Sequence, residues 1–118
     1  MSRKPALIKL VNLEEGMPTV EEARQRLERE LNVAREQKVT ALRVVHGYGA
    51  SGVGGALRVA LQLHLQELKK SGAIREVIFG ENWRIADEAS WQWLQRYPEW
   101  KQDRDLNRQN KGISIVVL

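Results

Sequence analysis

The chain has 118 residues, of which 42% are hydrophobic and 29% are charged, fractions that are typical of a folded globular protein. This length supports one domain, and the absence of cysteine excludes a disulfide scaffold, a thiol nucleophile and a cysteine-ligated zinc site. The net charge of +4 permits a polyanionic partner without requiring one. Two counts are unusual: four tryptophans stand beside one phenylalanine, and five of the nine glycines fall within residues 47–55.

The start of the chain does not read as a targeting signal. Lys9 interrupts the first apolar residues, and no small-residue cleavage site follows them. No apolar stretch approaches the roughly 18 residues that a membrane-spanning helix needs. We therefore expect a soluble cytoplasmic protein with no membrane partner.

Hydrophobic periodicity predicts strands and helices in alternation. The expected strands are residues 6–13, 40–46, 74–79 and 113–118, and the expected long helices are residues 20–37 and 55–71. The first helix has a capping box, in which Thr19 and Glu22 bond each other's backbone amides. The second is followed by Gly72, a residue suited to the turn after a helix.

A tryptophan-rich insert at about residues 80–111 separates the last two strands. It holds all four tryptophans: Trp83, Trp91, Trp93 and Trp100. A short helix is expected at residues 87–97, because Pro98 ends it. Two interpretations of the tryptophans stay open. They pack the insert onto the sheet, or exposed rings beside basic residues stack on nucleic-acid bases or bind a protein partner.

The segment from His46 to Arg58 carries the clearest chemical signal. A strand ends on a histidine, a glycine-rich loop follows, and a helix begins. Ligands of open α/β sheets bind beyond the carboxyl ends of the strands, and glycines let backbone amides approach a phosphate at a helix N-terminus. The pattern predicts a phosphate-binding loop in which Gly47, Gly49 and Gly52 offer amides and Arg58 pairs with the anion.

Other interpretations of this loop are weaker. The glycines Gly47, Gly49 and Gly52 also fit the dinucleotide-binding fingerprint, but no acidic residue stands at the end of the next strand, where Glu81 comes only after Phe79. The lysine of a nucleotidase P-loop is absent too. A tight turn without a ligand, or a site for a small phosphate or nucleotide, stays as an alternative.

His46-Gly47-Tyr48-Gly49, which follows the expected strand, resembles the His-Gly-x-Gly signature of the Smr (small MutS-related) domain family. Residues 19–23 and 112–118 resemble the start of that family's first helix and its closing strand. The resemblance implies a single Smr-like domain over residues 1–118, interrupted by the insert. It also implies a two-layer α/β sandwich with a mixed four-stranded sheet and helices on one face, similar to the C-terminal domain of translation initiation factor three.

The resemblance implies that the protein binds DNA or RNA, and many members also cleave one of them. It places functional residues at His46, Gly47 and Gly49, with Tyr48 at the variable position between the glycines. His46 would act as an acid–base group or as a hydrogen-bond donor to phosphate.

One family motif is missing. Where the family's first strand usually ends in Leu-Asp-Leu-His-Gly, residues 10–16 read Leu-Val-Asn-Leu-Glu-Glu-Gly. Phosphodiester cleavage needs a group that activates the nucleophile or protonates the leaving oxygen, or a metal ion that does so. Glu14 or Glu15 is the candidate replacement carboxylate. The sequence therefore favours binding, with at most a weak or degenerate endonuclease activity.

The remaining candidate residues give a weaker functional signal. His64 lies on the apolar stripe of its helix and is interpreted as a histidine at the edge of the core. With two histidines and no cysteine, no cofactor or metal site is recognisable, and metal dependence stays open. The alternative function is a protein-interaction module that uses the tryptophan-rich insert, with a vestigial anion loop.

Overall fold

The computed structural model describes residues 5–48 and 53–118. Its elements in chain order are β1 (Ile8–Asn12), α1 (Val20–Glu36), β2 (Ala41–Val45), α2 (Val53–Ser71), β3 (Glu76–Phe79), the 3₁₀ turn η1 (Gly80–Asn82), α3 (Glu88–Arg96), the 3₁₀ turn η2 (Pro98–Gln102) and β4 (Ile113–Val117). Each strand and helix expected from the sequence is present, with bounds that differ by at most two residues. No helix among the described residues is both long and apolar enough to cross a membrane.

The four strands form one mixed sheet in the order β1-β2-β4-β3. β1 and β2 are parallel and are connected by α1, whereas β4 runs antiparallel to both of its neighbours. β3 therefore points in the same direction as β1 and β2, although β4 separates it from them. As a result, the carboxyl ends of β1, β2 and β3 lie at one end of the sheet, which is also where β4 begins.

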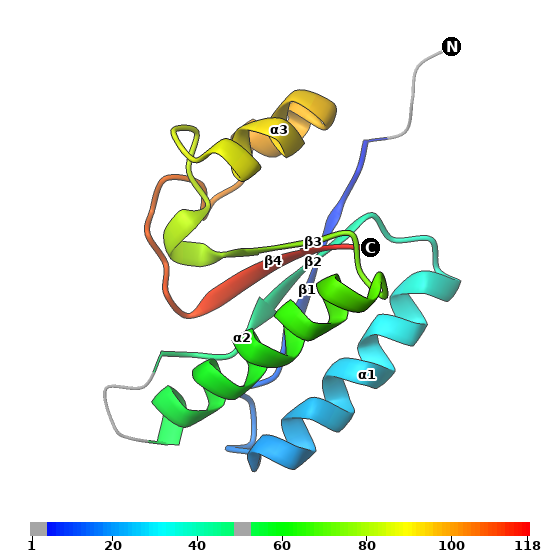
Figure 1. Cartoon of the computed structure of the whole chain (residues 1–118), viewed down its shortest axis with the longest axis vertical. Helices are drawn as coiled ribbons and strands as arrows, with labels where there is room; N and C mark the ends of the chain where they lie inside the picture. Colours follow the sequence, from blue (N-terminus) through cyan, green and yellow to red (C-terminus); the bar gives the residue numbers. More distant parts are fainter. Residues whose placement is uncertain (1–4, 49–52) are drawn as a thin grey trace.

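The long helices α1 and α2 pack side by side on one face of this sheet (Figure 1). The capping box of α1 is confirmed, because Thr19 Oγ1 accepts from the Glu22 amide and Glu22 Oε1 accepts from the Thr19 amide. The helix buries Ala23, Leu27 and Leu31, residues that recur every four positions. They pack against the sheet and α2 in the first of two hydrophobic clusters.

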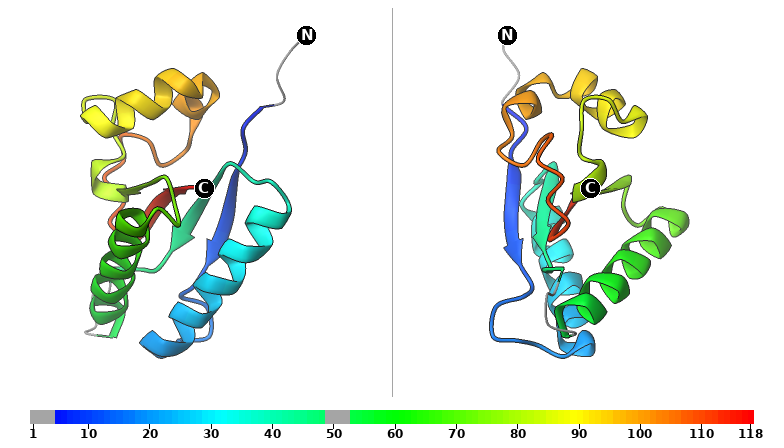
Figure 2. Two further views of the ribbon diagram at one scale, coloured as in Figure 1. Left: turned by 45° about the vertical axis from the view of Figure 1, so that its right-hand side comes forward. Right: turned by 90° about the vertical axis from the view of Figure 1, so that its left-hand side faces the viewer.

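The insert packs on the opposite face of the sheet, so the expected two-layer sandwich gains a further partial layer (Figures 1 and 2). Alternation along the strands provides both faces. In β2, Leu42 and Val44 belong to the cluster under the long helices, whereas Ala41 and Val45 contact the cluster of the insert. The second cluster contains Trp83, Leu94, Trp100 and Leu106.

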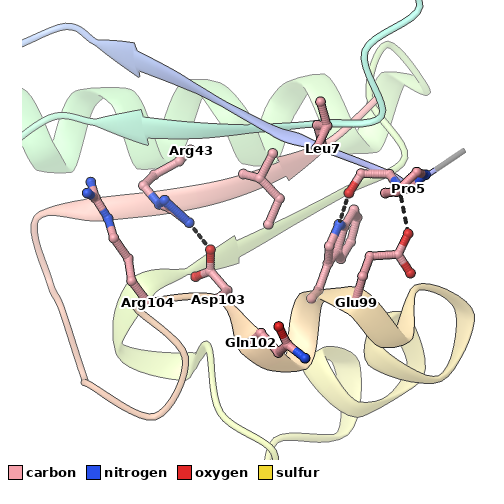
Figure 3. A pocket seen from close by; sticks show the side chains of 10 residues that line it. Pro5, Leu7, Arg43, Glu99, Gln102, Asp103 and Arg104 are labelled. Atoms are coloured by element: carbon pink, nitrogen blue, oxygen red, sulfur yellow. Dashed lines mark hydrogen bonds and ion pairs between the residues drawn. The ribbon is translucent and has the colours of Figure 1, made fainter.

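A buried ion-pair cluster ties the insert to the middle of the sheet. Arg43 of β2 is on the insert face and pairs with Asp103, while its Nε lies 3.0 Å from Asp105 Oδ2. Figure 3 shows Arg43 reaching from β2 towards Asp103 beside an open pocket. Trp83 Nε1 donates to the same aspartate over 3.0 Å. Buried charges are stable only when they are paired, so this cluster defines where the insert docks.

Two residues of the turn η2 form hydrogen bonds to Ala6, which precedes β1. Trp100 Nε1 donates to the Ala6 carbonyl at 2.8 Å, and Glu99 accepts from the Ala6 amide at 2.6 Å (Figure 3). The interpretation that tryptophans pack the insert onto the sheet is confirmed for Trp83 and Trp100, which are almost fully buried.

Candidate functional site

The residues after β2 form a turn that is held by the start of β4. The amides of His46 and Gly47 both donate to the carbonyl of Gly112, each over 3.0 Å. Gly47 has φ +71°, in the left-handed region that glycine adopts without a steric penalty. A Cβ atom at Gly112 would lie 3.3 Å from Tyr48 Cδ1, so the two segments are in close contact. The turn is therefore part of the sheet's hydrogen-bonding framework.

The His46 side chain is fully buried within this framework. Its Nδ1 lies 2.8 Å from the Gly47 carbonyl oxygen, and its Nε2 lies 2.9 Å from Ser114 Oγ on β4. Because a carbonyl can only accept, Nδ1 carries the proton, and Nε2 of the neutral ring accepts from the Ser114 hydroxyl. Burial lowers the pKa of His46, outweighing the opposing effect of its hydrogen bond to Gly47.

The ring consequently has no free nitrogen for a substrate. Both roles expected for His46, acid–base group and phosphate donor, require one of these two hydrogen bonds to open. The Gly47 amide is likewise engaged by Gly112, so it reaches a phosphate only by giving up that bond. Gly49 and Gly52 lie outside the described residues.

Tyr48 is the part of the signature that faces solvent, with 59% of its surface exposed. The start of α2 returns towards it, since a Cβ atom at Gly55 would lie 4.0 Å from the Tyr48 carbonyl oxygen. Lys111, just before Gly112, is also exposed. An exposed aromatic ring is suited to stacking on a flat ligand.

Glu14 brings a carboxylate to the same turn from the end of β1. A Cβ atom at Gly47 would lie 2.8 Å from Glu14 Cδ, so the carboxylate lies directly over the glycine. Asn12 Oδ1 accepts from the amides of Glu14 and Glu15 at 2.9 and 3.2 Å and so turns the chain after the strand. Of the two glutamates considered from the sequence, Glu14 is thus placed beside the His46–Gly47 turn.

Arg58 of α2 forms an ion pair with Glu81, which follows β3 in η1. Both side chains are about one-quarter exposed, at 24% and 26%. Both charges act on His46: Arg58 lowers its pKa, and Glu81 and Glu14 raise it. Sequence reasoning missed Glu81 as a site residue. The available signal was its position just after a strand that points the same way as β1 and β2.

Further polar atoms lie unpaired around this ion pair. Arg58 Nε, Glu81 Oε1 and Gln62 Nε2 are buried atoms with no hydrogen-bond partner among the described residues. Buried polar atoms are normally satisfied, so each of these three atoms lacks a partner that the described residues do not supply.

The other candidates lie elsewhere. His64 Nε2 is 2.8 Å from Glu28 Oε1, which joins α2 to α1 and agrees with a histidine at the edge of the core. Within the described part of the chain, no three His, Cys, Asp or Glu residues are grouped to hold a metal ion. The expected protein contact through four tryptophans needs correction: Trp83 and Trp100 are core residues, which leaves Trp91 and Trp93 for a partner.

Comparisons with known proteins establish the family of the chain and a structure with a similar fold. A model of the Smr domain matches residues 15–81, more than half of the chain, and the chain therefore belongs to the Smr domain family. The Smr domain of Thermus thermophilus MutS2 has a similar fold, with a TM-score of 0.57 and 23% sequence identity over 94% of this chain and 98% of that one. Among curated proteins, no match was found.

We predict that His46 makes the stability of the fold depend on pH. The unfolded chain protonates this histidine below a pH of about 6.5, whereas the buried ring resists protonation. The unfolded state then binds more protons, so the free energy of unfolding falls as the pH drops from about 6.5 towards 5. Urea unfolding of the wild type and His46→Gln at both pH values measures this loss.

The variant is expected to be less stable than the wild type at neutral pH, but to lose less stability on acidification. His64→Gln is the matched control and keeps His46 intact, so it should lose more stability on acidification than His46→Gln does. Equal losses in the wild type and His46→Gln would contradict the assigned burial of a neutral ring.

Proposed function

We propose that the protein binds nucleic acid at the end of the sheet where β1, β2 and β3 terminate. The observation that carries this proposal is Tyr48, an exposed ring that follows His46 and Gly47, whose amides are held by the carbonyl of Gly112 just before β4. Every base offers a face on which an aromatic ring can stack, so Tyr48 suits a nucleic-acid strand irrespective of its sequence. Membership of the Smr domain family supports the same ligand class.

Arg58 is the proposed phosphate contact, and the Glu81 carboxylate competes with phosphate for its guanidinium. A phosphate oxygen and the Glu81 carboxylate offer the guanidinium the same kind of charged acceptor. Binding therefore exchanges one ion pair for another, and Arg58 Nε is available for a second hydrogen bond. Beyond this pair, the amides of Gly49 and Gly52 belong to the proposed phosphate-binding loop.

The same geometry supports binding over efficient cleavage. The His46 ring is enclosed, and the segment in place of the family's first motif offers the Glu14 carboxylate without a second histidine. Incubation of the wild type with labelled RNA and duplex DNA tests for cleavage directly, with His46→Ala beside it. A rapid cleavage that His46→Ala abolishes would assign the ring a catalytic role instead.

We predict that Tyr48→Ala weakens binding about 5- to 150-fold, the loss that corresponds to one stacked base. Tyr48→Phe keeps the ring and should bind like the wild type. Fluorescence anisotropy with labelled single-stranded RNA, single-stranded DNA and duplex DNA measures the affinities and shows which strand type is preferred. If Tyr48→Ala binds all three as tightly as the wild type, the proposed contact is wrong.

We also predict that Glu81→Gln tightens binding, because it removes the carboxylate that competes for Arg58. Arg58→Gln should weaken binding and reduce the slope of log affinity against log salt concentration by about 0.7 to 0.9, the contribution of one phosphate contact. Arg24→Gln removes an exposed charge from α1 and serves as the control for net charge. Unchanged salt slopes for Arg58→Gln, or weaker binding by Glu81→Gln, would argue against this exchange.

A further inference from the structure

A second group of aromatic and basic side chains lies at the other end of β3. Trp93 and Tyr97, one turn apart on α3 and at its end, have nearly parallel rings, with 6.3 Å between their centroids and 3° between their planes. The Arg96 guanidinium lies 5.8 Å from the centroid of Trp93 and 5.9 Å from that of Tyr97. Arg75, which precedes β3, adds a second guanidinium 5.2 Å from the Trp93 ring.

These two arginines carry charge that the protein itself does not neutralise. Both are exposed, and within residues 5–48 and 53–118 neither forms an ion pair with a carboxylate. Two like charges beside one ring repel each other, and an anion bound between them would relieve that repulsion. The nearby carboxylate of Glu76 is already engaged, since it pairs with Lys69 at 2.5 Å and lies 3.4 Å from Trp93 Nε1.

The outer strand β3 connects the group to the proposed interface. β3 is an outer strand of the sheet, and α2 lies beside it, with Arg58 paired to Glu81 at one end and Lys69 paired to Glu76 at the other. The six steps from Arg75 to Glu81 span at most about 20 Å of extended chain. About six stacked nucleotides at 3.4 Å each cover that length.

We propose that single-stranded nucleic acid continues from Tyr48 and Arg58 along the β3 edge to Trp93. This inference rests on the proposed function and extends its site. Bases would stack on the half-buried Trp93, and Arg75 and Arg96 would pair with backbone phosphates. Of the charged residues named here, Arg58 and Lys69 are paired with Glu81 and Glu76, which leaves Arg75 and Arg96 as an excess of two positive charges. This excess of positive charge favours a polyanion as the partner over a peptide, acidic or neutral, whose surface charge is mixed.

The insert offers a matched control on the opposite flank of α3. Trp91 is 39% exposed, and its ring lies 5.2 Å from Lys101 Nζ, so it is also an aromatic residue beside a cation. Trp91 and Trp93 are two residues apart, and a helix turns about 200° over that interval. Trp91 therefore faces away from the β3 edge, and Trp91→Leu should not change the binding of a strand that follows it.

The test compares labelled oligo(dT) and oligo(U) strands of about 4 and about 12 nucleotides. The shorter strand covers only the Tyr48 end of the surface, and the longer strand reaches Trp93. Trp93→Leu and Arg96→Gln should each weaken binding of the longer strand, Trp93→Leu at least about five-fold. Both should leave the shorter strand unaffected. Tyr48→Ala should weaken both lengths. Arg96→Gln changes only an exposed side chain, so it tests the proposal even if Trp93→Leu disturbs the fold.

The outcomes separate this inference from the function on which it rests. If Tyr48→Ala weakens binding while the Trp93 and Arg96 variants match the wild type on the longer strand, the β3-edge surface is overturned and the proposed function stands. If only the Trp93 and Arg96 variants weaken binding, the site at Tyr48 is overturned instead. Equal losses for Trp91→Leu and Trp93→Leu would also contradict a defined path along β3.

Discussion

The carbonyl of Gly112 is the group on which the site depends, because it accepts the amides of both His46 and Gly47. β4 is thereby joined to the end of β2, and the His46 ring closes the junction through Ser114. The left-handed conformation of Gly47 is what brings the next residue out of the sheet. Tyr48 is exposed although His46 and Gly47 before it are buried, so these two signature residues position a residue that the signature leaves variable.

The insert has a different task, since it closes the sheet face that the two long helices leave open. Arg43 and its aspartates hold it at the middle of β2, while Trp83 and Trp100 supply apolar volume. Trp83 and Trp100 are buried in the core, whereas α3 places Trp93 beside Arg75, which precedes the outer strand β3. The four tryptophans thus divide into two core residues, a half-buried Trp93 that packs against the insert cluster, and an exposed Trp91.

Local chemistry made most of the fold predictable from sequence. The capping box at Thr19, the apolar period of α1 and the stop at Pro98 act within a few residues, and each was read correctly. Contacts between distant residues could not be read in that way. The partner of Arg43 lies 60 residues away at Asp103, and that of His46 lies 68 residues away at Ser114. The sequence therefore predicted the signature residues. It did not predict the burial of His46, or the ion pair between Arg58 in α2 and Glu81 just after β3.

The most direct test of the central claim is an NMR titration of the ¹⁵N-labelled protein with an unlabelled single-stranded oligonucleotide. The amide of Tyr48 and the side chain of Arg58 are predicted to shift first, followed by the indole NH of Trp93 when the strand is long enough to follow β3. The outer side of α1, including Arg24 and Arg29, should stay unchanged. Shifts confined to α1, or an oligonucleotide that leaves Tyr48 and Arg58 unperturbed at saturation, would contradict the account.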